Sequence, residues 1–221
     1  MKIAILQPTY LPWLGYFSLI KSVKKLIFLD DVQFDRRSWQ QRNIIADKTK
    51  QNIYLTIPVK KKGNYLSKIN FMEINYQEKW VKKHLLTIQH CYSKYKYFNE
   101  INNRINEIIN RKYKYLSELN IDLILYIIEY LEIDIEINLS SKLNVSGKKD
   151  EKLLNIIKKV GGDHYISPAG SKNYLENENL IKKNNINFGY MEYTDHYKNN
   201  DQSLSIIHFL FQYGKKAIKL I

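Results

Sequence analysis

Two adjacent aspartates, Asp30 and Asp31, are well suited to proton transfer. They follow an apolar run, Leu26–Leu29, that is short enough for one buried strand. Two neighbouring carboxyl groups raise the pKa of one of them towards neutrality, which suits a general base. A turn at the end of the strand is the alternative interpretation. His84, which shares a predicted helix face with Trp80, is the third catalytic candidate, and a packed structural histidine is its alternative.

A second group of side chains has the chemistry of ligand binding. Amide, hydroxyl and aromatic residues follow an earlier apolar run, Ile3–Leu6, and arginines follow the aspartate pair. Guanidinium groups bind phosphate through two parallel hydrogen bonds, and these arginines are dense for a chain whose basic residues are mostly lysine. A solvated loop is the alternative interpretation of residues 35–43. The predicted substrate-binding residues of the opening stretch are Gln7, Thr9, Tyr10, Trp13, Gly15, Tyr16, Gln33, Arg36, Arg37, Ser38 and Asn43.

A loop of small residues provides a third candidate. It follows a short predicted strand, Tyr165–Ile166, and precedes a predicted helix. Free backbone N–H groups at a helix start bind anions, so Ser167, Gly170 and Ser171 are predicted ligand contacts. An ordinary turn is the alternative.

These candidates require an α/β scaffold to position them. The run Ile3–Leu6, a helix containing Phe17 and Ile20, and the run Leu26–Leu29 form the strand, helix and strand of a βαβ unit. Open α/β sheets bind ligands at the carboxyl ends of their strands, which is where the candidates lie. Further strands are predicted at 44–46, 53–59, 69–74, 133–139 and 186–193, and helices from 77 onwards and over 98–131, 150–160 and 203–213. The predicted fold is therefore one α/β domain, residues 1–221, with a Rossmann-like parallel-sheet core and a helical insertion at approximately 77–132.

Composition and charge restrict the class of protein. The 221 residues include one cysteine, Cys91, which excludes an intrachain disulfide and suits a reducing cytoplasm. No apolar run is long enough for a membrane-spanning helix, and Met1 and Lys2 lead directly into the first strand, without room for a signal peptide. A cytoplasmic protein is expected. The net charge of +13 suits anionic small molecules such as sugar nucleotides. Specific nucleic-acid binding is not expected, because the lysines are scattered.

The opening motif QPTYLPWLGYFSLIKSVKKLIFLDDVQFDRRSWQQRN resembles the signature of the WbqC-like family. The resemblance continues through 56–59, 80–88, 165–175 and 204–214, and so covers nearly the whole chain. That family is associated with gene clusters for bacterial surface polysaccharide, particularly the O-antigen of lipopolysaccharide. The resemblance implies a role in polysaccharide synthesis. Within that context the leading hypothesis is a transferase that adds an acyl-type group, taken from a donor, to a nucleotide-linked amino sugar.

The opening stretch is also similar, more distantly, to the nucleotidyltransferase-like Rossmann fold, whose first loop carries His-x-Gly-His. Here Trp13-Leu14-Gly15-Tyr16 keeps the glycine and lacks both histidines. The likeness implies that the serine loop 167–171 lies where that fold places its second phosphate loop. This likeness implies an alternative, a ligase or nucleotidyltransferase that uses ATP and Mg²⁺, with Asp30 or Asp31 holding the metal. A non-catalytic sugar-nucleotide-binding protein is a further alternative. The sequence itself assigns no cofactor and leaves a homo-oligomer open.

Overall fold

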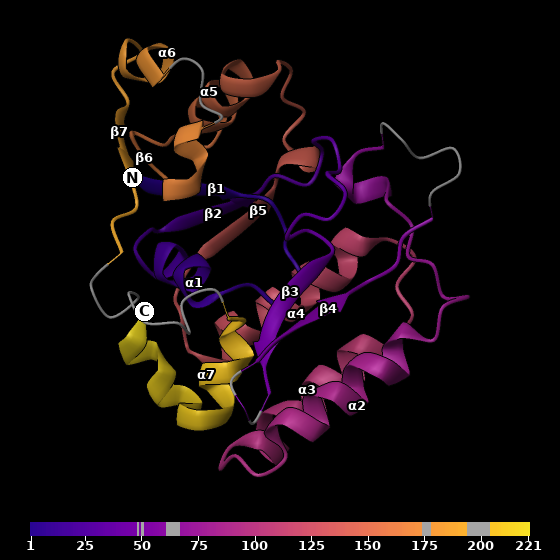
Figure 1. Ribbon diagram of the computed structural model, residues 1–221. Coiled ribbons are helices and arrows are strands. Elements are labelled where there is room, and N and C mark those ends of the chain that lie inside the picture. Colours follow the sequence, from indigo (N-terminus) through magenta and orange to yellow (C-terminus); the bar gives the residue numbers. More distant parts are fainter. Residues whose placement is uncertain (48, 50, 61–66, 174–177, 194–203) are drawn as a thin grey trace. The chain divides into compact units, whose positions relative to one another are not determined.

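The computed structural model describes residues 1–47, 49, 51–60, 67–173, 178–193 and 204–221 (Figure 1). The chain forms two units. Unit 1 comprises Met1–Gln7, Gly15–Asp31 and Ile133–His196, and unit 2 comprises Pro8–Leu14, Val32–Glu132 and Tyr197–Ile221. Residues 77–132, which the sequence predicts as a helical insertion, all lie in unit 2, together with residues 32–76.

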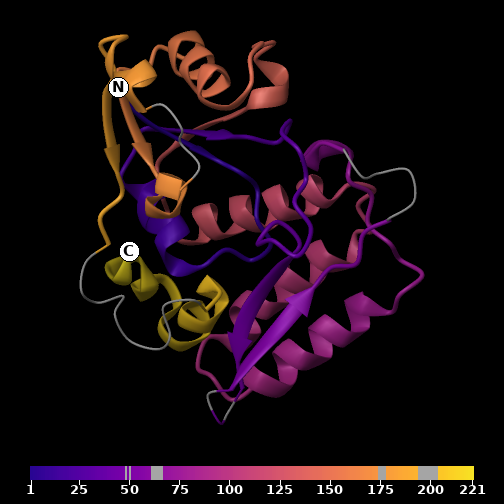
Figure 2. The same ribbon diagram turned by 45° about the horizontal axis from the view of Figure 1, so that its top comes forward.

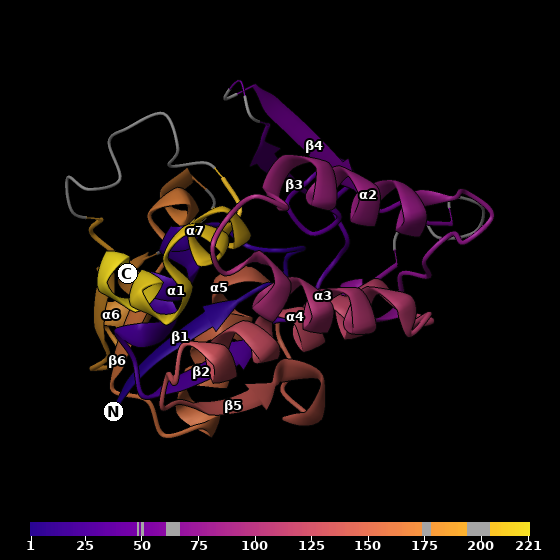
Figure 3. The same ribbon diagram turned by 90° about the horizontal axis from the view of Figure 1, so that it is seen from below.

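Unit 1 contains a five-stranded sheet in which all paired neighbours run parallel. Its strands are β1 (Lys2–Leu6), β2 (Lys25–Phe28), β5 (Glu136–Leu139), β6 (His164–Ser167) and β7 (Asn187–Tyr190). The spatial order is β5-β2-β1-β6-β7. Figure 3 shows β1, β2 and β5 side by side. The order reverses between β1 and β6, which makes this pair the topological switch point of the sheet. The predicted Rossmann-like α/β core is confirmed.

Helices cover both faces of this sheet. Ile3 and Ile5 of β1 pack with Leu154 and Ile157 of α5 (Lys149–Lys159) and with Ile181 of α6 (Glu178–Lys182) in one apolar core. The helix α1 (Leu14–Lys21) lies on the opposite face (Figure 2). Strands buried on both faces are apolar at successive positions, which explains why β1 and β2 have continuous apolar runs and no alternation.

Unit 2 combines a hairpin with helices. The antiparallel strands are β3 (Arg42–Ala46) and β4 (Asn52–Thr56), and the hairpin lies beside α2 (Trp80–Tyr92) (Figures 1 and 3). Between the two strands, the carboxylate of Asp47 accepts hydrogen bonds from the backbone N–H groups of Thr49 and Gln51 at 2.7 and 2.9 Å. The remaining long helices are α3 (Phe98–Asn110), α4 (Leu116–Tyr130) and α7 (Ile206–Tyr213). The described residues include no helix long and apolar enough to cross a membrane.

The strand predicted at 69–74 is wrong. Residues Ile69–Phe71 form a 3₁₀ helix, η1, and the N–H group of Met72 donates to the carbonyl of Ile69 at 3.2 Å. Ile69 and Met72 are buried at a spacing of three, which is the period of a 3₁₀ helix, whereas Phe71 is 57% exposed. A short apolar run does not separate these two structures. Residues 195–202, whose polar composition predicts a loop, fall outside the described residues.

Gly214 ends α7 and provides a test of this packing. Its backbone (φ 56°, ψ −140°) lies in a region that is essentially reserved for glycine, and a Cβ atom would lie 2.7 Å from the ring of Tyr97. We expect Gly214→Ala to lower the free energy of unfolding by about 1–3 kcal/mol, measured by urea denaturation. Gly189→Ala is the control, because a Cβ atom there meets nothing within 4 Å. Equal losses in the two variants would contradict this explanation.

Candidate functional site

The carboxyl ends of the unit 1 strands bring several predicted site residues to one edge of the sheet. Asp30 and Asp31 follow β2, Gln7 follows β1, and Ser167 ends β6. Neighbouring strands are about 4.8 Å apart, so this edge is a continuous row of polar groups. We call these residues, together with the loop 168–171, the strand-end site.

Asp30 is held by two serines that follow β5. One carboxylate oxygen accepts hydrogen bonds from the Ser140 hydroxyl and the Ser141 N–H group, both at 3.0 Å, and the other accepts from the Ser141 hydroxyl at 2.6 Å. Asp30 is 3% exposed. Its carboxylate therefore joins the end of β2 to the 3₁₀ helix η2 (Ser140–Lys142). Neither serine was predicted as a site residue, because residues 140–149 have the Ser-, Lys-, Asn- and Gly-rich composition of a linker.

Asp31 is the more accessible carboxylate. It accepts a hydrogen bond from the Lys152 ammonium group at 2.5 Å, and its side chain is 13% exposed. The Ser140 hydroxyl contacts Asp31 as well as Asp30. A hydroxyl has one proton, so Ser140 donates to one carboxylate at a time. Lys152, on α5, supplies the positive charge that allows two carboxylates to lie this close together. No local pattern in the sequence distinguishes Lys152 from the other lysines.

The serine loop forms a directed chain of hydroxyl groups. Ser171 donates to the carbonyl of Pro168 at 2.7 Å, and the Ser167 and Ser171 hydroxyls are 2.6 Å apart. The Tyr165 hydroxyl lies 3.2 Å from that of Ser167, and burial raises the pKa of Tyr165 to about 12, so it remains protonated. Both serine hydroxyls are thus bonded within unit 1. Gly170, by contrast, is exposed, and nothing lies within 4 Å of a Cβ atom built there.

Gln7, Gly15 and Tyr16 also lie in unit 1. The Tyr16 hydroxyl donates to the backbone carbonyl of Gln7 at 3.0 Å, and burial raises the pKa of Tyr16. Gly15 is buried and the side chain of Gln7 is exposed. Tyr16 therefore fixes the backbone at the end of β1, and the Gln7 side chain is the group that reaches solvent.

The structure brings Tyr10 and His84 together within unit 2. The Tyr10 hydroxyl is 3.1 Å from His84 Nδ1, and both side chains are buried. Burial lowers the pKa of His84 to about 4, and the charge of Lys83 adds to this effect, although a hydrogen bond to the Thr56 backbone opposes it. The imidazole is consequently neutral at pH 7. Of the remaining predicted contacts in this segment, Thr9 and Trp13 are half-buried.

Asn43 holds the loop that contains Tyr10. Its amide donates to the carbonyls of Tyr10 and Leu11 at 3.1 and 2.7 Å. Asn120, which the sequence analysis missed, donates to the carbonyls of Pro8 and Gln40 at 3.1 and 2.8 Å. Both asparagines are buried, so their amides organise backbone within unit 2.

The arginine segment forms an ordered turn. The Gln40 and Gln41 side chains accept hydrogen bonds from the N–H groups of Asp35 and Arg37, at 3.1 and 3.3 Å, and the Ser38 hydroxyl donates to the Asp35 carbonyl at 2.6 Å. The turn exposes four residues: Asp35, Arg36, Arg37 and Trp39. Gln33 is also exposed. Binding of phosphate by these arginines stays a prediction.

No group of three or more histidine, cysteine, aspartate or glutamate side chains in the described part of the chain is arranged to hold a metal ion. Cys91 is buried.

Fold and site together define a Rossmann-like α/β protein with polar groups at the carboxyl edge of its sheet. The chain belongs to the WbqC-like protein family, whose sequence pattern matches residues 7–220. It is also similar to the uncharacterized protein Rv1507c of Mycobacterium tuberculosis, with 31% identity over 224 residues that cover 98% of this chain and 95% of the relative. No solved structure matches the chain significantly.

The buried state of His84 predicts a pH dependence of stability. Between pH 6.5 and about 4 the unfolded chain binds a proton at His84 that the folded chain does not bind. The free energy of unfolding should therefore fall by about 3 kcal/mol as the pH drops through this window. Urea denaturation between pH 4 and 7 measures the slope, which His84→Gln should reduce. His90→Gln, at an exposed position of the same helix, is the control and should keep the slope. An unchanged slope in His84→Gln would exclude a buried neutral imidazole.

Proposed function

We propose that this WbqC-like protein binds a nucleotide-linked amino sugar at the strand-end site and transfers an acyl-type group to it, as a cytoplasmic step of surface polysaccharide (O-antigen) assembly. The observation that carries the binding proposal is the reversal of strand order between β1 and β6. Open α/β sheets bind nucleotides in the crevice outside this point. Family membership supports the polysaccharide context.

The serine loop is the proposed phosphate-binding element. It follows β6 directly, and its exposed residue Gly170 allows a phosphate to approach the backbone N–H groups of the 3₁₀ helix η3 (Ala169–Asn173). Ser167 and Ser171 contribute by holding the turn in shape. The exposed side chain of Gln7, across the switch point, is the proposed contact for the base or sugar.

Asp31 is the proposed general base. Acyl transfer forms a bond between the sugar amine and the acyl carbon, breaks the bond from that carbon to the donor, and releases a proton from the amine. Asp31 is more exposed than Asp30, whose carboxylate is fully engaged by serines. It can take that proton, and Ser140 and Lys152 hold it in place.

The strand order also favours a second candidate, an enzyme that uses ATP and Mg²⁺. Counted along the chain, the order is third, second, first, fourth, fifth, with the serine loop after the fourth strand. This arrangement suits nucleotide binding as such, so ATP is a reasonable ligand for the same loop. A ligase that activates its substrate by adenylyl transfer would release pyrophosphate, which separates it from direct acyl transfer.

Gly170 allows a direct test of ligand binding. We expect a UDP-, GDP- or dTDP-linked amino sugar at 100 times its dissociation constant to raise Tm by about 5–10 °C. Gly170→Asp should abolish this shift, because a carboxylate then faces the phosphates. Gly170→Asn, whose side chain has the shape of aspartate without its charge, should retain most of the shift. Gly189→Asp controls for charge elsewhere in unit 1. Stabilisation by ATP and Mg²⁺ alone would favour the second candidate, and equal loss in both Gly170 variants would contradict phosphate binding there.

Asp31 allows a test of catalysis with the sugar nucleotide that gives the largest shift. With acetyl-CoA as the acyl donor, Asp31→Asn should lower kcat by 10²–10⁴-fold and leave the affinity for the sugar nucleotide within threefold of the wild-type value. Mass spectrometry of the acylated sugar measures turnover. Binding without turnover in the wild type would support a non-catalytic sugar-nucleotide-binding protein, and wild-type turnover in Asp31→Asn would exclude this base.

A further inference from the structure

An open groove of about 970 Å³ lies within unit 2. Three chain segments line it: residues 59–60, residues 73–78 before α2, and residues 112–114 between α3 and α4. Its volume is at the upper end of the range of small-molecule sites, roughly 300–1,000 Å³. It has room for a ligand of more than one ring.

Backbone hydrogen bonds fix the three segments to one another. The N–H group of Ile74 donates to the carbonyl of Lys114 at 3.1 Å, and that of Lys60 donates to the carbonyl of Glu73 at 2.9 Å. Single β-bridges join Val59 to Ile74 and Glu73 to Tyr115. The groove is therefore preorganised, which reduces the entropy lost when a ligand binds.

Two half-buried tyrosines give the groove its aromatic surface. The Tyr76 hydroxyl donates to the carbonyl of Tyr113 at 3.0 Å, and the Tyr113 hydroxyl contacts Asp122, which also binds Arg111 at 2.8 Å. The rings are thus fixed at their polar ends. Aromatic faces accept the apolar C–H face of a sugar ring, and amide and carboxylate side chains accept and donate hydrogen bonds to its hydroxyls. Asn75, Gln77 and Glu78 supply such groups.

The charged side chains of the groove favour an anion. Lys60 and Lys114 share one carboxylate, that of Glu73, at 2.6 and 3.9 Å. Among the described residues, the ammonium group of Lys112 has no partner. Three lysines against two glutamates leave a net charge of +1 in the groove. Lys112 is therefore available to an incoming negative group without breaking the close Lys60–Glu73 pair. Lys114, whose ammonium group also lies 4.9 Å from the centroid of the Tyr115 ring, is the second cation of the groove that such a group can reach.

We propose that this groove binds an acidic oligosaccharide, with a sugar ring on Tyr76 and a carboxylate or phosphate of the sugar at Lys112 and Lys114. The nucleotide-sugar site proposed for unit 1 shares no residue with it, so either proposal can fail alone. The groove gives the protein a second carbohydrate site, suited to an acidic chain and not to the nucleotide-linked precursor.

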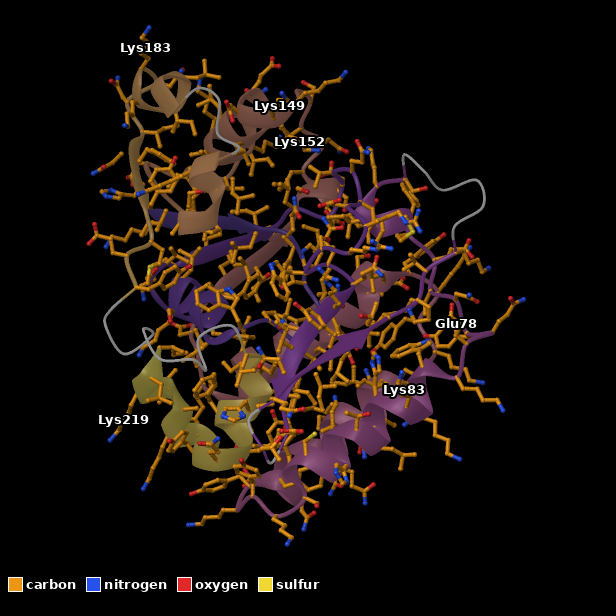
Figure 4. All side chains as sticks on the ribbon, viewed as in Figure 1. Glu78, Lys83, Lys149, Lys152, Lys183 and Lys219 are labelled. Carbon is orange, nitrogen blue, oxygen red and sulfur yellow. The ribbon has the colours of Figure 1, made fainter. Side chains whose placement is uncertain are left out.

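Titration calorimetry with trigalacturonate tests the proposal. Lys112→Glu should weaken binding at least tenfold, whereas Lys219→Glu, the same charge change at an exposed position far from Glu78 in Figure 4, should change it less than twofold. Gly170→Asp should leave binding unchanged. Equal weakening in the two lysine variants would overturn the proposal, because it would indicate diffuse attraction to a basic surface. No binding of trigalacturonate or of a sugar phosphate would also overturn it.

Four further ligands and two variants of Tyr76 test separately the parts of the ligand that the groove recognises. Glucose 6-phosphate that binds more tightly than glucuronate identifies phosphate as the preferred anion, and the reverse identifies carboxylate. Maltotriose, which is uncharged, should bind at least tenfold more weakly than trigalacturonate, and equal affinity for the two would exclude recognition of the charge. Full competition of inorganic phosphate with trigalacturonate would exclude recognition of the sugar. Tyr76→Phe should retain binding and Tyr76→Leu should weaken it at least fivefold, with Tm recorded for both. Unchanged binding in Tyr76→Leu would exclude the stacking contact.

Discussion

The Asp30 carboxylate accepts three hydrogen bonds from the two serines after β5, and the strand-end site depends on this contact. It is buried, and an unsatisfied buried polar group costs about 1–3 kcal/mol, so the three donors and the carboxylate require one another. Ser140 also contacts Asp31. The position of the more exposed carboxylate therefore depends on that of the buried one. Two adjacent residues of the same type thus have different tasks: Asp30 joins two strand ends, and Asp31 faces the accessible side.

Those parts of the fold that rest on local patterns were predictable from the sequence. The apolar run Ile3–Leu6, the helical spacing of Phe17 and Ile20, and the run Leu26–Leu29 located β1, α1 and β2, because periodicity and burial coincide there. The error at 69–74 came from a segment where burial follows a period of three over a single turn. The strand order could not be predicted, since it depends on pairing between residues as distant as Lys2 and His164.

The sequence predicted the residue types of the site, but only part of what each residue does. Tyr10 and Asn43 have the chemistry of ligand contacts, yet Tyr10 bonds His84 and the Asn43 amide bonds backbone carbonyls. A sequence does not show whether a polar side chain meets a ligand or satisfies the protein itself. Ser141 and Lys152 went unnoticed because each is more than 100 residues from the aspartate that it contacts. Arg36 and Arg37 are exposed on an ordered turn, which suits the role predicted for them.

The interleaved connectivity of the two units has a consequence for synthesis on the ribosome. β1 pairs with β6 across 162 positions, from Lys2 to His164, which corresponds to about 8–30 s of translation at 5–20 residues per second. During this interval one edge of an apolar strand has no neighbour, and the first pair of strands lacks the helices α5 and α6. An unpaired edge of an apolar strand is a template for pairing with another chain, so the nascent chain is exposed to aggregation for many seconds.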